Sequence, residues 1–192
     1  MPTVPALVAE SVAAAVERLR HGGIVACPTE AVWGLSCDPF DEAAVRRLLA
    51  LKQRAEDKGL ILVAGQASQL DGLVDWNRLP AGRREAVLAS WPGPHTWIVP
   101  ASDRVPRWIT GAHDGVAVRV SAHPVVAALC RGFDGPLVST SANLAARPPP
   151  RRRQDIDPDL AAAVDTIVGG ETGPLERPTQ IRDARSGRVL RV

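Results

Sequence analysis

The sequence predicts one α/β domain. Short apolar runs alternate with segments of helical periodicity along the chain, a pattern typical of a sheet flanked by helices. The length of 192 residues fits one domain and can bury a sizeable core. No repeat and no linker divides the chain. We therefore expect a single domain over residues 1–192.

The first third predicts two helices and two strands. Apolar residues at helical spacing predict an amphipathic helix over 8–20. Residues 24–27 predict a short buried strand. Asp41 is a good N-cap for a helix that ends near Lys52, and the apolar run 60–64 predicts another buried strand.

The rest of the chain continues the alternation. Further helices are expected at 80–90, 124–131 and 158–164, and further strands at 96–99, 116–120, from 137 onward, 166–168, 179–183 and 188–192. Residues 145–153 (Ala-Ala-Arg-Pro-Pro-Pro-Arg-Arg-Arg) exclude regular structure and predict a stiff, basic, exposed loop.

Composition excludes several classes of protein. The hydrophobic fraction of 45% and charged fraction of 23% are those of a soluble globular protein. The net charge of +2 gives no global reason to bind nucleic acid, although it permits a local basic patch. No signal peptide and no apolar run of membrane-spanning length is present, so we expect a cytoplasmic protein.

Neither cysteine nor histidine spacing predicts a metal site. Cys27, Cys37 and Cys130 are odd in number and form no CxxC pair, so we expect small buried side chains in a reducing cytosol. The four histidines lack metal-ligand spacing. P-loop, GxGxxG and HExxH motifs are also missing.

Lysine is rare and concentrated in one segment. Lys52 and Lys58 are the only lysines, and every other basic residue is arginine. If the helix ends near residue 51, Lys52 and Arg54 project together into one cleft, because alternate residues of extended chain point the same way. An ammonium beside an arginine and Gly59 is typical of a phosphate-binding site. The alternative is a helix end with ordinary surface charges.

A row of polar side chains follows the strand that begins at residue 137. In extended geometry Ser139, Ser141 and Asn143 face one side. Their hydroxyl and amide groups suit phosphate or ribose oxygens. The alternative is a turn in which these side chains bond their own backbone.

Arg119 lies in an apolar strand and must be paired. Its partner is either an internal acid, such as Glu30 or Asp38, or a substrate carboxylate held by two parallel hydrogen bonds. The segment 28–34 (Pro-Thr-Glu-Ala-Val-Trp-Gly) predicts a pocket rim. The Trp33 ring either stacks against a ligand there or, as is more common for tryptophan, packs in the core.

Together these segments resemble the YrdC/TsaC family, the threonylcarbamoyl-AMP synthases, in its short single-domain bacterial branch. The family signature KxR followed downstream by SxN is matched by Lys52-Gln-Arg54 and Ser141-Ala-Asn143. Further matching segments, in order, are Pro28-Thr-Glu-Ala-Val-Trp-Gly-Leu35, Cys37-Asp-Pro39, Asp57-Lys-Gly-Leu-Ile-Leu62, Trp91-Pro-Gly-Pro94, Arg107-Trp108, Val116-Ala-Val-Arg119, His123-Pro124, Pro136-Leu-Val-Ser139 and Gly170-Glu-Thr-Gly173.

The resemblance implies an open, twisted, mixed β-sheet flanked by helices, with a concave basic face. It implies an enzyme that joins L-threonine, bicarbonate or CO2 and ATP, with Mg2+, into threonylcarbamoyl-AMP and pyrophosphate. Separate transfer proteins would use this product to make threonylcarbamoyladenosine in tRNA. The basic face also allows for binding of tRNA or other RNA.

The resemblance also assigns residues. Lys52 and Arg54 would be catalytic and hold the ATP phosphates. The ATP site would comprise Lys52, Arg54, Lys58, Ser141, Asn143 and Arg191, and the L-threonine site Thr29, Arg119, Ser139 and Thr179. One departure lies after Asn143, where Ala145-Ala146 replaces the Ser-Gly common in the family.

The main alternative is a non-catalytic RNA-binding or ribosome-assembly protein, with Arg151–Arg153 as phosphate contacts. Its binding would weaken steeply with salt. It would not require an uncharged Ser/Asn row or an arginine in a strand. A carbamoyl-transfer module of hydrogenase maturation is disfavoured because those chains are longer and carry zinc-finger cysteines. A regulatory ATP- or amino-acid-binding domain is the least favoured hypothesis.

Overall fold

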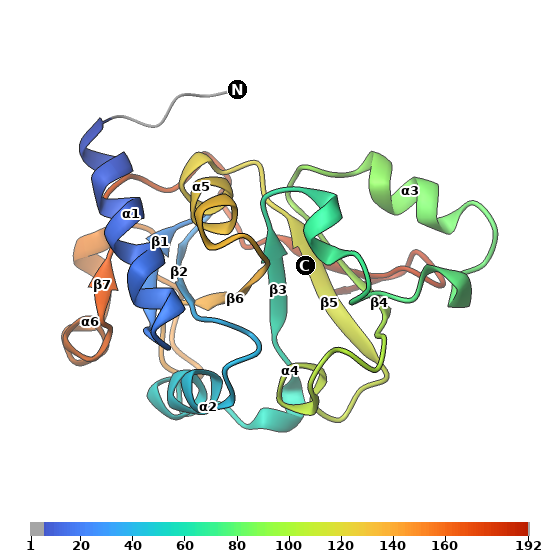
Figure 1. The fold of residues 1–192 in the computed structure, drawn as a ribbon, viewed down its shortest axis with the longest axis horizontal. Coiled ribbons are helices and arrows are strands. Elements are labelled where there is room, and N and C mark those ends of the chain that lie inside the picture. Colours follow the sequence, from blue (N-terminus) through green and yellow to red (C-terminus); the bar gives the residue numbers. More distant parts are fainter. Residues whose placement is uncertain (1–5, 192) are drawn as a thin grey trace.

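The computed structural model of the protein describes residues 6–191 (Figure 1). The α-helices are α1 (Ala6–Arg20), α2 (Glu42–Leu51), α3 (Arg83–Ala89), α4 (Arg107–Thr110), α5 (Pro124–Phe133) and α6 (Pro158–Ala163). Short 3-10 helices lie at Glu56–Lys58, Ala67–Leu70, Trp76–Arg78 and Arg153–Asp155. The strands are β1 (Val25–Pro28), β2 (Trp33–Ser36), β3 (Ile61–Ala64), β4 (His95–Pro100), β5 (Gly115–Val120), β6 (Leu137–Ser141), β7 (Thr166–Ile167), β8 (Gln180–Asp183) and β9 (Val189–Arg191).

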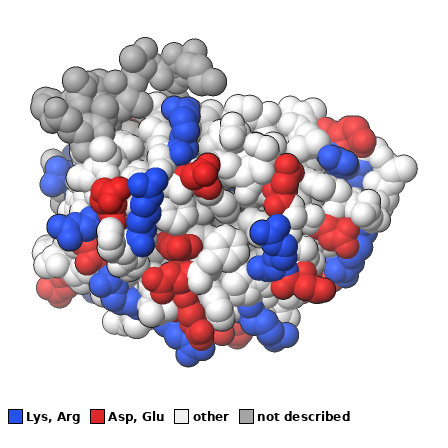
Figure 2. Space-filling model, viewed as in Figure 1, with Lys and Arg blue, Asp and Glu red and all other residues white. Residues whose placement is uncertain are grey.

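Within residues 6–191 the strands form one mixed, open sheet of nine in the order β7-β1-β2-β6-β3-β5-β4-β8-β9. The pairs β3–β5, β4–β8 and β1–β7 are parallel, and the other neighbouring pairs are antiparallel. The predicted α/β class with a mixed, unclosed sheet is therefore confirmed. The concave basic face stays a prediction, and the face in Figure 2 carries charges of both signs interspersed.

One strand, one α-helix and the short 3-10 helices were missed from the sequence. Residues 33 and 34 were expected only as the end of a pocket rim, yet residues 33–36 form strand β2, in which every residue is buried. A strand buried on both faces shows no polar alternation, and four residues with a central glycine give little pattern to detect. Trp33 is 1% exposed and belongs to the core. The missed α-helix, α4, is a single turn between Pro106 and Gly111.

Helices cover both faces of the sheet. On one face α1 and α5 lie side by side (Figure 1) and pack on Val25, Cys27, Val63 and Leu137. On the other face α2 packs in a cluster that includes Leu35, Leu62 and Val138. Strand alternation explains the division, since neighbouring residues point to opposite faces.

The expected burial of the cysteines is confirmed, because all three side chains are free and buried. Burial raises the pKa of Cys27 to about 12, which leaves its thiol protonated and unreactive. Over residues 6–191, none of the helices is both long and apolar enough to cross a membrane.

The proline-rich loop is more firmly anchored than expected. Arg151–Arg153 are exposed, as predicted, but Pro150 is buried and its carbonyl accepts a hydrogen bond from the Trp33 amide at 2.8 Å. The Arg151 guanidinium donates to the carbonyls of Leu175 and Glu176, each at 3.1 Å. The loop is therefore fastened to β2 and to the segment before β8.

Gly111 gives a stability prediction. Its φ is +63°, and an added Cβ would lie 2.5 Å from the Asp57 carbonyl oxygen and 2.6 Å from the Gly59 amide nitrogen. Because both the backbone conformation and the space favour glycine, we expect Gly111→Ala to lower the free energy of unfolding by about 2–4 kcal/mol. Gly82 is the matched control, since its φ is +74° with nothing within 4 Å. Gly82→Ala should cost only the left-handed strain of about 1 kcal/mol. Equal losses of unfolding free energy in the two variants, measured by urea unfolding, would contradict a role for the close backbone contacts of Gly111.

Candidate active site

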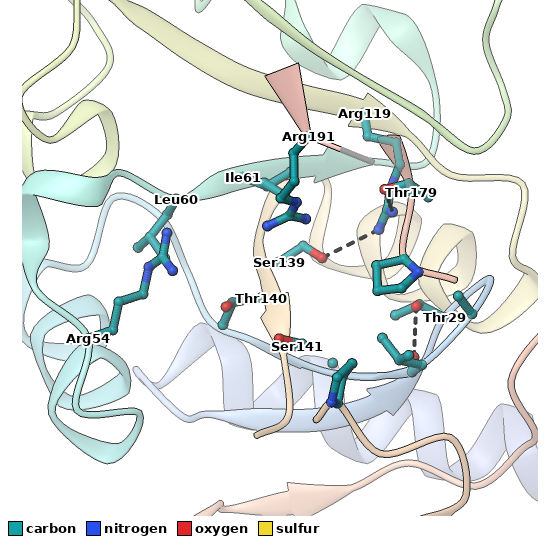
Figure 3. A pocket seen from close by; sticks show the side chains of 15 residues that line it. Thr29, Arg54, Leu60, Ile61, Arg119, Ser139, Thr140, Ser141, Thr179 and Arg191 are labelled. Atoms are coloured by element: carbon teal, nitrogen blue, oxygen red, sulfur yellow. Dashed lines mark hydrogen bonds between the residues drawn. The ribbon is translucent and has the colours of Figure 1, made fainter. Parts of the chain in front are cut away.

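A cavity of about 330 Å3 opens on the sheet where α1 and α5 no longer cover it. Its lining comes from five strands and several loops: Thr29, Ala31, Val32, Gly34, Arg54, Leu60, Ile61, Arg119, Ser139, Thr140, Ser141, Pro149, Pro178, Thr179 and Arg191. Figure 3 shows Arg54 at one end, Arg119 and Thr179 at the other, and the Ser139–Ser141 row between them. Most of the site residues expected from the sequence thus meet in one place.

The sheet register brings the key side chains together. Ile61 pairs with Ser139 on one side, and Val63 pairs with Arg119 on the other. Arg119 and Ser139 therefore flank β3 on one face of the sheet. The predicted alternation is confirmed for Arg119, because Val116, Val118 and Val120 pack in the core on the other face. Ser139 and Ser141 line the cavity as well, together with Thr140 between them.

Arg119 is buried, with 6% of its surface exposed, yet it lines the cavity. Its Nη1 donates to Thr179 Oγ1 at 3.0 Å, and its Nη2 lies 3.5 Å from Ser139 Oγ. Its ion-pair partner is Glu30, with 3.6 Å between Nη2 and Oε2. Of the alternatives left open by the sequence, Glu30 is the internal acid and Asp38 is not. The guanidinium still faces space that a substrate carboxylate could enter.

Two threonines complete this end of the cavity. Thr29 Oγ1 donates to the Val32 carbonyl at 2.8 Å, which fixes the turn between β1 and β2. Thr179 Oγ1 lies 3.2 Å from Thr96 Oγ1, which is fully buried. The arrangement is a chain of hydroxyls ending on the Arg119 guanidinium. Thr96 was not singled out from the sequence, because an isolated threonine in a strand carries no distinguishing pattern.

The opposite end is formed by the segment after α2. Gln53 has a φ of 50°, which turns the chain so that Arg54 enters the cavity. Arg54 Nη2 donates to the Gly59 carbonyl at 2.9 Å. An adjoining, mostly apolar slot of about 120 Å3 shares Arg54 and Arg191 with the cavity and is lined by Lys58 as well. Its apolar walls include Ile98, Ile109 and Ile181.

Lys52 points elsewhere than Arg54. It is 4% exposed, and its Nζ donates to the Ser141 carbonyl and, at 2.6 Å, to the Asn143 carbonyl. Lys52 thereby joins the two motifs from beneath the turn that follows β6, and it does not line the cavity described above. Burial, reinforced by the nearby Arg54 charge, lowers the pKa of Lys52 to about 8.

Asn143 behaves differently from the serines of its row. Its Nδ2 donates to the carbonyls of Leu144 and Arg147, at 3.0 and 2.5 Å. The turn alternative therefore holds for Asn143, whereas Ser139 and Ser141 face the cavity. Asn143 Oδ1 is buried and has no hydrogen-bond partner within the described part of the chain.

The charged side chains that line the cavity are all arginines. Burial and the neighbouring Arg191 charge lower the pKa of Arg54, and burial and the Arg119 charge lower that of Arg191. These shifts show that like charges face one another there. No carboxylate is found among the described residues that line the cavity, and residues 6–191 contain no cluster of metal-ligating side chains.

Part of the wall could not be found from the sequence. Pro149 and Pro178 both line the cavity, although they lie on separate loops. They come together because Arg151 bonds the carbonyls that precede Pro178. No sequence pattern connects these two loops.

Both the sequence and the fold are similar to those of known proteins. The model of the Sua5_yciO_yrdC family, described as telomere recombination, matches residues 17–192. The threonylcarbamoyl-AMP synthase of Xanthomonas euvesicatoria pv. vesicatoria is 62% identical over 177 residues, which cover 92% of this chain and 95% of that protein. The protein of the same name from Stenotrophomonas maltophilia is 61% identical with the same coverage.

Two solved structures have similar folds. P. abyssi Sua5 complexed with L-threonine gives a TM-score of 0.83 at 32% identity, covering 91% of this chain and 51% of that one. The chain therefore spans about half the length of that Sua5 protein. E. coli YciO gives a TM-score of 0.84 at 25% identity, covering 99% of this chain and 91% of that one.

Proposed function

The chain belongs to the Sua5/YciO/YrdC family, and on that basis we propose that it is a threonylcarbamoyl-AMP synthase. The reaction joins L-threonine, bicarbonate or CO2 and ATP, and it releases pyrophosphate. One observation carries the proposal: identity of 62% to a synthase of that name over 92% of this chain. It favours the synthase over a non-catalytic RNA-binding protein. Transfer of AMP makes the protein a nucleotidyltransferase.

We place L-threonine at the Arg119 end of the cavity. Arg119 would bind its carboxylate, with Thr179 and Ser139 holding the guanidinium and Thr29 on the facing rim. The match to a Sua5 protein solved with L-threonine supports threonine as a substrate, and the placement rests on Arg119, the guanidinium held in place by its neighbours at this end. A planar fork of N–H donors suits a carboxylate.

ATP occupies the other end in this proposal. Arg54 and Arg191 would contact its phosphates, with Ser141 on the cavity floor. The adjoining isoleucine-lined slot would take the apolar faces of the adenine ring, and Lys58 at its mouth would add positive charge. Lys52 and Asn143 would act from below, by fixing the turn that presents Ser141.

Magnesium would enter with ATP as part of the substrate. No carboxylate lies among the described cavity-lining residues, so phosphate oxygens and water would supply most of its ligands. Bound there, the ion would neutralise charge on the pyrophosphate.

The chemistry needs little covalent help from the protein. The unprotonated amine of threonine attacks CO2, and the amine loses a proton to give a carbamate. A carbamate oxygen then attacks the α-phosphorus of ATP, and the bond to the bridging oxygen of pyrophosphate breaks. Arg119 at one end and Arg54 with Arg191 at the other would hold the two substrates in line, so positioning and charge neutralisation supply the acceleration.

The product would pass to other proteins. Its activated acyl phosphate is suited to transfer onto an amine, which we propose is that of an adenosine in tRNA, through separate transfer proteins. On this proposal the protein works in the cytoplasm, where tRNA is modified. Any direct contact with tRNA would use basic side chains outside the cavity.

Pyrophosphate release tests the proposed function. We expect release from ATP only when L-threonine and bicarbonate are both present, and neither D-threonine nor chloride should replace them. Release that is independent of threonine would indicate simple hydrolysis of ATP to AMP and pyrophosphate and would count against the synthase.

Proton uptake tests the place of Lys52. With a pKa of about 8 in the empty protein, its amine is partly uncharged at pH 8.5. Nearby phosphates would favour the ammonium and raise this pKa, so ATP binding should take up roughly 0.5 proton at that pH. Below pH 7 the amine is already charged and uptake by Lys52 should vanish. Calorimetry in buffers of different ionisation enthalpy measures the uptake, and Lys52→Arg, which stays charged, should abolish it. Equal uptake in that variant would place the proton elsewhere.

A further inference from the structure

Glu30 is a buried carboxylate beside the candidate site that none of the assigned roles uses. Its neighbours Thr29 and Ala31 line the cavity, whereas Glu30 does not and is 7% exposed. A buried carboxylate is costly unless it is paired and hydrogen-bonded. The contacts of the Glu30 carboxylate therefore indicate its role.

The two oxygens of Glu30 have different surroundings. Oε1 accepts a hydrogen bond from Ser121 Oγ at 2.6 Å, and Ser121 Oγ in turn accepts one from the His123 amide at 3.1 Å. Oε2 has no hydrogen-bond partner among the described residues and lies 3.6 Å from Arg119 Nη2. The carboxylate is thus anchored at one oxygen and directs the other at the guanidinium.

Glu30 is also the counter-ion of the cavity. Arg54 and Arg191 form no ion pair with any residue of the described chain, and Arg119 pairs with Glu30 alone. Burial lowers the pKa of His123, so this neighbouring imidazole brings no competing positive charge. Without Glu30, Arg119 would have no ion-pair partner among the described residues to offset the repulsion between its charge and that of Arg191.

We infer that Glu30, anchored by Ser121, is a positioning residue that holds the Arg119 guanidinium in the orientation that binds the carboxylate of L-threonine. This inference rests on the proposed function. Two effects of removing the charge oppose each other. Loss of the Glu30 charge would relieve its repulsion of the threonine carboxylate, but Arg119 would lie between the two carboxylates and screen this repulsion. The loss of the counter-ion acts directly on the guanidinium, which would keep one good hydrogen bond, to Thr179.

Glu30→Gln tests the inference, because the amide oxygen can still accept from Ser121 while the charge is lost. We expect the KM and the calorimetric Kd for L-threonine to rise about 10-fold, with the KM for ATP changed less than about twofold. Glu30→Asp, which keeps the charge at a shorter reach, should recover part of the loss. Ser121→Ala, which frees the carboxylate, should give a smaller rise of the same kind.

Asp165→Asn is the matched control. Asp165 is likewise an acid paired with an arginine, Arg47, and it accepts the Ile24 amide at 2.7 Å, but Arg47, unlike Arg119, does not line the cavity. Its substitution should lower stability without changing the KM for L-threonine. The inference fails if Glu30→Gln binds L-threonine as well as or better than the unmodified protein, if both substrates weaken equally, or if Asp165→Asn has the same effect. An unmodified protein that neither binds L-threonine nor releases pyrophosphate would overturn the proposed function itself, and this inference with it.

Discussion

Replacing Arg119 by lysine is expected to raise the KM for L-threonine by about 100-fold or more. Lysine keeps the positive charge opposite Glu30, so the buried carboxylate is not left unpaired. It loses the planar fork, and with it the contact to Thr179 and a bidentate grip on the substrate carboxylate. Hydrogen bonds to charged groups contribute about 1.5–3 kcal/mol each, and the loss of two accounts for the predicted size.

Steady-state kinetics with each substrate varied in turn measure this effect. The KM for ATP should stay within a few-fold of its original value, because the nucleotide end is formed by other arginines. Arg83→Lys is a matched control, since Arg83 donates to the Ala184 carbonyl at 2.7 Å and stacks on Trp97, outside the cavity. It should cost stability only. An unchanged threonine KM in Arg119→Lys would remove the basis for placing threonine there.

The second large effect is expected from Lys52→Met. Methionine fills similar space but cannot bond the carbonyls of Ser141 and Asn143, so the turn that presents Ser141 to the nucleotide loses its anchor. We expect kcat/KM for ATP to fall by about 100-fold or more, which corresponds to about 2.7 kcal/mol of transition-state stabilisation. Stability should change by less than about 2 kcal/mol, because the cost of burying an ammonium is removed at the same time.

Lys58 supplies the comparison, as the only other lysine of the chain. It is exposed at the mouth of the isoleucine-lined slot. Solvent screens an exposed charge, so Lys58→Met should weaken ATP binding by only about 2- to 5-fold. Equal losses in the two variants would show that bulk positive charge, and not the buried anchor, is what Lys52 contributes.

Local alternation predicted much of the site. Ser139 and Ser141 share a face in any extended strand, and Arg119 points to the face opposite its valine neighbours. An arginine within an apolar strand also had to find an acid, and Glu30 was one of two acids named. These predictions needed only periodicity and the cost of burying charge.

Other features depend on long-range contacts that no local pattern encodes. The direction of Lys52 is set by carbonyls about ninety residues away, at Ser141 and Asn143. The positive φ of Gln53, which separates Lys52 from Arg54, gives no signal in the sequence. Strand β2 was hidden because both of its faces are buried, and the proline wall forms only once Arg151 joins two loops.

Mass spectrometry of the product tests the central claim most directly. The purified protein would be incubated with ATP, magnesium, L-threonine and 13C-bicarbonate, and the reaction quenched at once because the product hydrolyses. We predict threonylcarbamoyl-AMP carrying a single 13C, formed together with pyrophosphate and absent when any one substrate is omitted. AMP and pyrophosphate without a labelled threonylcarbamoyl adduct, from a folded protein that binds ATP, would contradict the assignment.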